Sequence, residues 1–201
     1  MIDSNFTASE GDQRRHDYRL LMNIYQKRKT KVVAALCGNG FTEIQPSSPG
    51  PHGVQNRSFQ AARIFVNRAG DQVVKIAEDP AYAAFVEWAT EHRSVTVPVF
   101  LRHVECGQRD AKDGSYWTYT RMERLEELTQ EEASAVQSWF DSFVATKGLS
   151  TLDPFGLLQT LLTLQQVAIV AGRGLELTKT SGLMVRPAGS SRQFVFTDPF
   201  N

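Results

Sequence analysis

The sequence predicts an α+β protein with its strands mainly in the first part of the chain and its long helices later. Short apolar runs separated by turn signals occupy positions 59–77 and 95–122, whereas residues at helical spacing dominate positions 129–171. The strand–helix alternation of a doubly wound sheet is missing, and no GxGxxG motif follows a strand. These observations favour a sheet-rich part followed by a helical part.

The first part of the chain begins with a polar stretch, and we expect residues 1–16 to form a flexible tail. Residues 17–54 are expected to be an N-terminal helical extension and loop. Asp17 is placed to cap a helix that extends to about Leu36, and the Pro-, Gly- and Ser-rich stretch 46–58 is typical of a loop.

A β-hairpin and a helix are predicted next. The apolar runs 59–67 and 72–77 flank the short turn RAGD, which is the pattern of a hairpin. Asp79 can cap the following helix, 81–92, and Pro80 suits its first turn. Alternation along the second strand places Lys75 on a strand with apolar neighbours on both faces, where an ammonium is costly unless it meets an anion.

Two further strands and two long helices follow. Residues 95–104 and 116–122 are predicted strands joined by a polar loop. The sequence TQEE (129–132) is a capping box, and the next helix has an apolar face that includes Val136 and Val144. Asp153 and Pro154 are expected to open a helix that is apolar nearly all round and therefore buried. Strands 182–186 and 193–197 end the chain.

The composition excludes several classes of function. The chain carries 22 basic and 22 acidic residues, so it lacks the cationic surplus that a dedicated nucleic-acid binder needs. Two cysteines cannot make a disulfide framework, which favours a reduced, cytoplasmic setting. The apolar stretch 154–171 is interrupted by glutamines, so we expect no membrane span.

Several short motifs together resemble those of protein-kinase-like proteins. The shared layout is a lysine in VVKI, a helix, an MERL segment after a strand, a long buried helix, a short loop, an xMxR segment and a strand ending in TDP. The chain looks most similar to the small, divergent Ser/Thr protein kinases of lytic coliphages and their bacterial relatives, in which the catalytic segment reads like DxHxGNIM and TDP replaces DFG. The matching segments here are ELTKTSGLMVR (176–186) and FVFTDPF (194–200).

The resemblance covers about residues 55–201 and implies a minimal two-lobed protein-kinase-like fold. The N-lobe, 55–125, would be an antiparallel sheet with one helix, and 126–201 would be a truncated helical C-lobe. It implies ATP and Mg²⁺ as cofactors, and a protein substrate or a regulatory protein partner. The expected location is the cytoplasm, which would be the cytoplasm of a host cell if the protein is phage-encoded or secreted.

The resemblance also assigns roles on the nucleotide side of the site. Lys75 would contact the ATP phosphates, and either Glu87 or Glu91 would pair with it. The turn 56–62 would cover the phosphates, with Phe59 at its tip; the alternative for this turn is Gly38–Phe41, and we prefer 56–62. The hinge expected against the adenine spans 122–125 and includes Met122, Glu123 and Leu125.

On the chemical side, the resemblance implies that Asp198 chelates Mg²⁺ and Glu176 orients the accepting hydroxyl. Lys179 would steady the transferred phosphate, and Ser181 would offer an oxygen to the metal. The chain departs from the family here, because Glu176 replaces an Asp and Ser181 an Asn. The turn 56–62 also lacks the glycines that let backbone N–H groups approach phosphate.

Three functions stay open from the sequence. The first is an ATP-dependent phosphotransferase acting on protein Ser or Thr. The second is a catalytically impaired pseudokinase used as a binding or regulatory module, which the departures motivate. The third is an unrelated α+β interaction protein. The acidic run 123–132 is expected to be a solvated helix start rather than a docking patch for a basic substrate.

Overall fold

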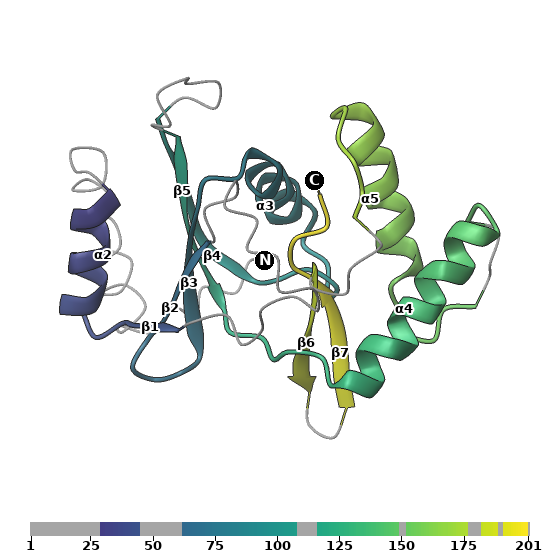
Figure 1. Cartoon of the computed structure of the whole chain (residues 1–201), viewed down its shortest axis with the longest axis horizontal. Helices are drawn as coiled ribbons and strands as arrows, with labels where there is room; N and C mark the ends of the chain where they lie inside the picture. Colours follow the sequence, from purple (N-terminus) through teal and green to yellow (C-terminus); the bar gives the residue numbers. More distant parts are fainter. Residues whose placement is uncertain are drawn as a thin grey trace, which may run out of the picture. The chain divides into compact units, whose positions relative to one another are not determined.

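The computed structural model describes residues 29–44, 62–107, 116–148, 152–176, 182–188 and 191–200. Within these ranges the protein is α+β, with a five-stranded sheet of order β1-β2-β3-β5-β4, a two-stranded sheet and four helices (Figure 1). The predicted α+β class is therefore confirmed, and the kinase-like arrangement stays a prediction. The chain divides into two compact units, residues 1–77 with 104–119 and residues 78–103 with 120–201. Each unit is described by itself.

The first unit contains the predicted hairpin. Strands β2 (Arg63–Val66) and β3 (Gln72–Ala77) pair antiparallel with Ile64 opposite Lys75, and β1 (Thr42–Ile44) pairs with β2 on its other side. The turn closes because the Asn67 side-chain oxygen accepts hydrogen bonds from the backbone N–H groups of Asp71 and Gln72, both at 3.1 Å. Along β3, Val74 and Ile76 are buried and Lys75 between them is half-buried.

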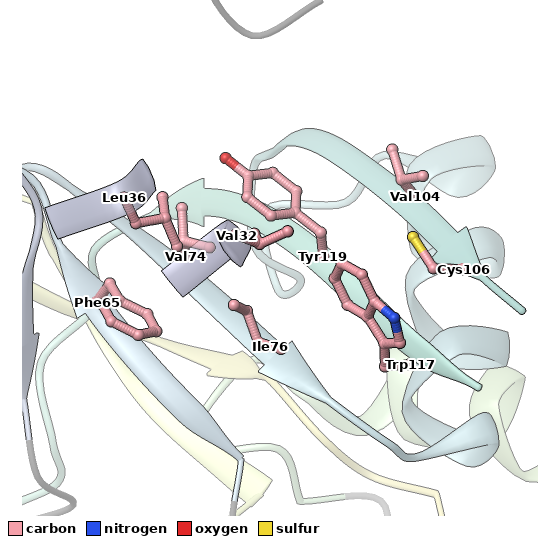
Figure 2. Packing of buried hydrophobic residues seen from close by; sticks show 9 residues of the cluster. All are labelled: Val32, Leu36, Phe65, Val74, Ile76, Val104, Cys106, Trp117 and Tyr119. Carbon is pink, nitrogen blue, oxygen red and sulfur yellow. The ribbon is translucent and has the colours of Figure 1, made fainter. Parts of the chain in front are cut away.

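A hydrophobic cluster forms the core of this unit (Figure 2). Helix α2 (Lys29–Gly38) covers one part of it, so the helix predicted for 17–36 is observed over its described residues. Residues 17–28 lie outside the described ranges. The buried members of the cluster are Val32, Leu36, Phe65, Val74, Ile76, Val104, Cys106, Trp117 and Tyr119.

Helix α3 (Pro80–His92) belongs to the second unit and confirms the predicted helix. Asp79 is its N-cap and accepts hydrogen bonds from the N–H groups of Ala81 at 2.8 Å and Tyr82 at 3.2 Å. Phe85, on the buried face, contacts three aromatic rings, including that of Phe200 at a centroid distance of 6.0 Å. These contacts place α3 beside the end of the chain (Figure 1).

The boundaries of the next two strands differ from the prediction. Strand β4 is Phe100–Cys106 and β5 is Trp117–Glu123, whereas strands over 95–104 and 116–122 were expected. Residues 94–97 form a turn instead, in which Val97 N–H donates to the Ser94 carbonyl at 3.2 Å and the Ser94 and Thr96 hydroxyls lie 2.7 Å apart. Side-chain hydrogen bonds of this kind compete with strand pairing.

Helix α4 (Gln130–Ala145) has the predicted capping box. The Thr129 hydroxyl accepts from the N–H of Glu132 at 3.2 Å, and the Glu132 carboxylate accepts from the N–H of Thr129 at 2.7 Å. Its apolar face packs on the terminal hairpin through Phe140 and Phe196. The prediction was wrong for Val144, which is 60% exposed because it lies off this face.

Helix α5 (Leu158–Val170) begins later than predicted. Asp153 does prepare it, because its carboxylate accepts from the N–H groups of Leu157 and Leu158, but residues 154–156 form a turn. The expectation of burial all round was also wrong. Only one face is covered, and Val170 is 88% exposed.

The second sheet is the predicted terminal hairpin. Strands β6 (Leu183–Ala188) and β7 (Ser191–Phe196) pair antiparallel, with Leu183 opposite Phe196. In Figure 1 they are the yellow strands beside α4. Leu183 and Phe196 form the last pair at the open end of the hairpin. Asp198 comes two residues after Phe196, so the hairpin positions the candidate site.

Candidate functional site

The strongest candidate site in the second unit is the backbone around Asp198. Thr197 and Asp198 both donate their N–H groups to the Gly182 carbonyl, at 2.8 and 3.4 Å. On the other side, Glu176 donates its N–H to the Pro199 carbonyl at 2.9 Å. The backbone on either side of Asp198 is therefore hydrogen-bonded to Glu176 and Gly182, two residues of the segment 176–186 that the resemblance identifies as catalytic.

Gly182 makes this arrangement possible. A Cβ atom built on Gly182 would lie 2.7 Å from the Asp198 carbonyl oxygen, a separation that real Cβ atoms do not adopt. Any larger residue must push the two backbone segments apart. The sequence showed Gly182 only as the first residue of a strand, and no role was predicted for it.

The Asp198 side chain faces a buried environment. Its Oδ1 oxygen is buried, and the pKa of the Tyr82 phenol is raised far above its usual range, first by burial and then by the Asp198 charge. Tyr82 is fully buried in the first turn of α3, one turn before Phe85. The charge of Asp198 therefore acts on a buried phenol that keeps its proton.

Tyr82 belongs to a line of buried polar groups. Its hydroxyl donates to the Met122 sulfur at 3.9 Å, and a hydrogen bond with the Thr120 hydroxyl acts to lower its pKa, against the two larger effects. Thr120 in turn lies 2.8 Å from Nδ1 of His103. Sequence reasoning missed this line, because its members come from α3, β4 and β5 and no local pattern connects them.

The predicted hinge is held by side-chain contacts within the second unit. The Glu123 carboxylate accepts from Arg186 Nε at 2.9 Å, from Arg186 Nη2, and from the Val99 N–H at 2.8 Å. Arg186 also donates to the carbonyls of Val95 at 2.6 Å and Val97 at 3.0 Å and to Gln193 Oε1 at 3.1 Å. All five guanidinium donors are used.

The other hinge residues lie close by. Met122 is half-buried at the end of β5, and Leu125 is buried. Glu126 exchanges two backbone hydrogen bonds with Val185, each of 2.9 Å, which joins the hinge to β6. Whether an adenine binds here stays a prediction.

The acidic run 123–132 is partly neutralised by internal pairs. Arg192 donates to Glu126 at 2.6 Å and to Glu132 at 2.7 Å, and Arg186 pairs with Glu123. Hydrogen bonds from Arg192 are the main reason why the pKa of Glu132 is lowered. These pairs reduce the charge available to a basic substrate. The expected helix start is wrong for most of the run, because Glu123 ends β5, Glu126 forms a bridge with Val185 and α4 begins only at Gln130.

The remaining predicted residues lie elsewhere or outside the described ranges. Lys75 is half-buried in the first unit, whereas Asp198 belongs to the second, so their convergence stays a prediction. Glu87 and Glu91 are exposed on α3, away from buried Phe85, as expected. The positions outside the described ranges are Phe59, Lys179 and Ser181.

The alternative for the phosphate-covering turn, Gly38–Phe41, is the end of a helix. The N–H groups of Asn39 and Phe41 both donate to the Leu36 carbonyl, at 3.0 and 3.1 Å, and Gly40 has a φ of 81°. These bonds close the last turn of α2 and use the N–H groups that a phosphate would need. Residues 56–61 of the preferred turn lie outside the described ranges.

Across the ranges that the structure covers, no group of three or more His, Cys, Asp or Glu side chains is arranged to hold a metal ion. Comparison with known protein families, curated proteins and solved structures finds no match to this chain. In the same ranges, every helix is too short or too polar to traverse a lipid bilayer.

Proposed function

We propose that the chain is an ATP-dependent phosphotransferase of the protein Ser/Thr kinase type, with its chemistry centred on Asp198. One observation carries the proposal: both ends of the 176–182 segment are hydrogen-bonded to the backbone on either side of Asp198. A strand-end carboxylate bracketed by a polar loop is an arrangement suited to phosphate chemistry, which depends mainly on positioning and on charge neutralisation.

Asp198 offers a suitable ligand for Mg²⁺. Magnesium is commonly held by one or two carboxylates, with phosphate and water oxygens as the other ligands. The carboxylate of Asp198, which follows β7 and has a buried Oδ1, supplies oxygen ligands of this kind. When bound, Mg²⁺ would supply positive charge against the phosphates, and Lys75 would supply a second cation from β3.

In the proposed reaction, the bond between the γ-phosphorus and the β–γ bridging oxygen breaks and ADP leaves. A bond forms between that phosphorus and the hydroxyl oxygen of the protein substrate. Glu176 accepts the hydroxyl proton, and the resemblance assigns Lys179 the role of steadying the transferred phosphate. A general base of this kind contributes about 10²–10⁴-fold in rate.

The experiment compares the wild-type chain with Asp198→Asn and with Asp141→Asn, an exposed α4 carboxylate that serves as the matched control. ADP and ATP binding is titrated with and without Mg²⁺, and γ-phosphate transfer to a bait protein or to the chain itself is followed. We expect Asp198→Asn alone to lose Mg²⁺-dependent binding and transfer. Equal behaviour of all three proteins would refute the proposal.

A second candidate is a nucleotide-binding module without transfer. Glu176 favours it, because its carboxylate extends one methylene further than that of Asp, and a misplacement of about 1 Å can cost roughly 10²-fold in rate. Mg²⁺-dependent nucleotide binding without phosphate transfer would select this candidate. Glu176→Asp tests this explanation: if the longer side chain of Glu176 prevents transfer, the variant should transfer phosphate faster than wild type.

A further inference from the structure

A short chain of hydroxyl groups joins helix α5 to the turn that precedes β4. The Thr160 hydroxyl of α5 lies 2.5 Å from the Thr96 hydroxyl, which in turn lies 2.7 Å from that of Ser94. The Ser94 hydroxyl also accepts the N–H of Thr96 at 3.2 Å. Thr96 and Thr160 are both buried. Removing either hydroxyl therefore deprives a buried polar group of a partner, which is costly where water cannot replace it.

The same turn supports the terminal hairpin. The Thr96 carbonyl accepts from the Phe196 N–H of β7 at 2.9 Å. The carbonyls on either side of it, those of Val95 and Val97, accept from the Arg186 guanidinium of β6 at 2.6 and 3.0 Å. Three consecutive carbonyls of one turn are thus bonded to the two strands of the hairpin. A displacement of the turn would therefore displace the hairpin as well.

The supported strand end leads directly to the candidate carboxylate. Phe196 is buried, is the last residue of β7 and lies opposite Leu183. Asp198 follows two residues later, and the Gly182 carbonyl accepts the N–H groups of both Thr197 and Asp198. Every step from α5 to the carboxylate is therefore a hydrogen bond or a short stretch of chain, and all of these residues belong to the second unit.

We propose that Thr160 is a positioning residue for Asp198: its hydroxyl holds Thr96, whose carbonyl holds the end of β7, so that α5 sets where the carboxylate lies. The inference deepens the proposed function and rests on it for its biological meaning, because it concerns the same carboxylate. It assigns Thr160 no contact with metal or nucleotide, and its effect on binding is exerted through the strand end.

The first test needs neither metal nor nucleotide. Amide hydrogen exchange is measured in the full chain for wild type, Thr160→Val and Thr163→Val. Thr163 is the matched control, because its hydroxyl donates to the Gln159 carbonyl of its own helix at 2.9 Å. We expect Thr160→Val to speed exchange of the Phe196 N–H by about tenfold, the size of one buried hydrogen bond, and Thr163→Val to leave it unchanged.

The amides of α4 report any general loss of stability in the same experiment. Unchanged exchange at Phe196 in Thr160→Val overturns the inference, and so does equal acceleration at Phe196 and throughout α4. Thr96→Val removes the other half of the same contact and keeps the inference testable if Thr160→Val does not fold. It should speed exchange at Phe196 to a similar extent, and unchanged exchange there would equally overturn the inference.

A double-mutant cycle tests the hydroxyl contact itself. Unfolding constants are measured for Thr96→Val, Thr160→Val and the double variant, since valine preserves the shape of threonine and removes only the hydroxyl. We expect non-additivity of about fivefold in the unfolding constant, whereas the cycle of Thr96→Val with Thr163→Val should be additive. Thr160→Ser keeps the hydroxyl and should restore wild-type exchange at Phe196. Additivity in the first cycle would contradict the inference.

Nucleotide binding connects this contact to the candidate site, with Mn²⁺ and ADP as the probe in calorimetric titrations. Thr160→Val should weaken binding by about tenfold, less than the roughly 10²-fold that a misplacement of about 1 Å can cost in rate. Thr160→Ser should restore it. If exchange at Phe196 responds but wild type and Asp198→Asn bind equally, the proposed function fails and the support of the strand end stands. If Asp198→Asn loses binding while Thr160→Val binds like wild type, the positioning role is overturned and the proposed function stands.

Discussion

The two compact units differ in how they bond their buried hydroxyl groups: in the first, Thr118 donates to the Ala77 carbonyl at 3.3 Å. The described core of the first unit is a cluster of aliphatic and aromatic residues around α2 and the β2–β3 hairpin. The second unit also buries polar groups that bond to one another, such as Thr96 and Thr160, whose hydroxyls lie 2.5 Å apart. An apolar cluster stabilises without fixing orientation, whereas a buried polar network requires one alignment of its members. The hydroxyls of Thr96 and Thr160 therefore fix each other's orientation, whereas the backbone fixes that of Thr118.

The largest expected effect is in the apolar cluster. Phe65→Ala removes a fully buried ring from the centre of the first unit and should lower the free energy of unfolding by about 3–5 kcal/mol. Urea denaturation measures the loss. The Cys106 thiol reports the same event, because burial raises its pKa to about 11 and shields it from labelling.

In Phe65→Ala, labelling of Cys106 should accelerate, while exposed Cys37 reacts at its wild-type rate. Asp198→Asn should leave the rate at Cys106 unchanged. Equal acceleration by both substitutions would show that the two units open together, and the comparison between them would lose its basis.

The next effect concerns the two arginines of the terminal hairpin. Arg186 is 20% exposed and makes five hydrogen bonds, so Arg186→Ala should cost about 2 kcal/mol of unfolding free energy. Arg192, at 35% exposure, should cost less. Arg186→Lys tests the geometry, because lysine keeps the charge but has three donors. A full rescue by lysine would contradict the account.

Gly182→Ala sharpens the comparison at the site itself. The new Cβ would meet the Asp198 carbonyl, so we expect a loss of about 1–3 kcal/mol together with weaker Mg²⁺-dependent nucleotide binding. Gly38→Ala is the control, since nothing lies within 4 Å of a Cβ built there. That variant should be neutral or slightly stabilising in the same denaturation assay. Unchanged nucleotide binding by Gly182→Ala would show that the backbone hydrogen bonds around Asp198 do not contribute to the site.

The smallest effect is a pH dependence at Glu132. Hydrogen bonds from Arg192 lower the pKa of this carboxyl, so its contribution to stability is present above the ordinary carboxyl pKa and is lost as pH falls through the lowered value. Glu132→Gln should therefore be less stable than wild type near pH 7. The difference should shrink as the urea midpoint is followed into the acid range. A difference that persists at low pH would point to lost packing instead.

Elements with local signals were predicted well from the sequence. Asp79 with Pro80 and Thr129 with Glu132 place α3 and α4 because capping acts within one turn. The segment 95–99 was misjudged, since its alternating valines suggest a strand while Ser94 and Thr96 hold a turn. The covered face of α5 could not be predicted, because an all-apolar helix does not indicate which side has a neighbour.

The candidate site divides in the same way. Asp198 and Glu176 could be proposed from the sequence because each lies in a short motif, and the Glu176 N–H donates to the carbonyl of Pro199, the residue after Asp198. Tyr82 and the pairing of Glu123 with Arg186 could not be found, because the latter partners lie 63 residues apart and meet only in the folded chain. Contacts between distant residues leave no periodic pattern in a sequence.

The hydrogen bonds on either side of Asp198 have a consequence for how this chain could change. Glu176 and Gly182 are each tied to the same strand end by their own hydrogen bonds, so the five positions between them can vary without moving the carboxylate. Under the proposed function, substitutions in that short stretch would change the chemistry while the two anchoring hydrogen bonds stay in place.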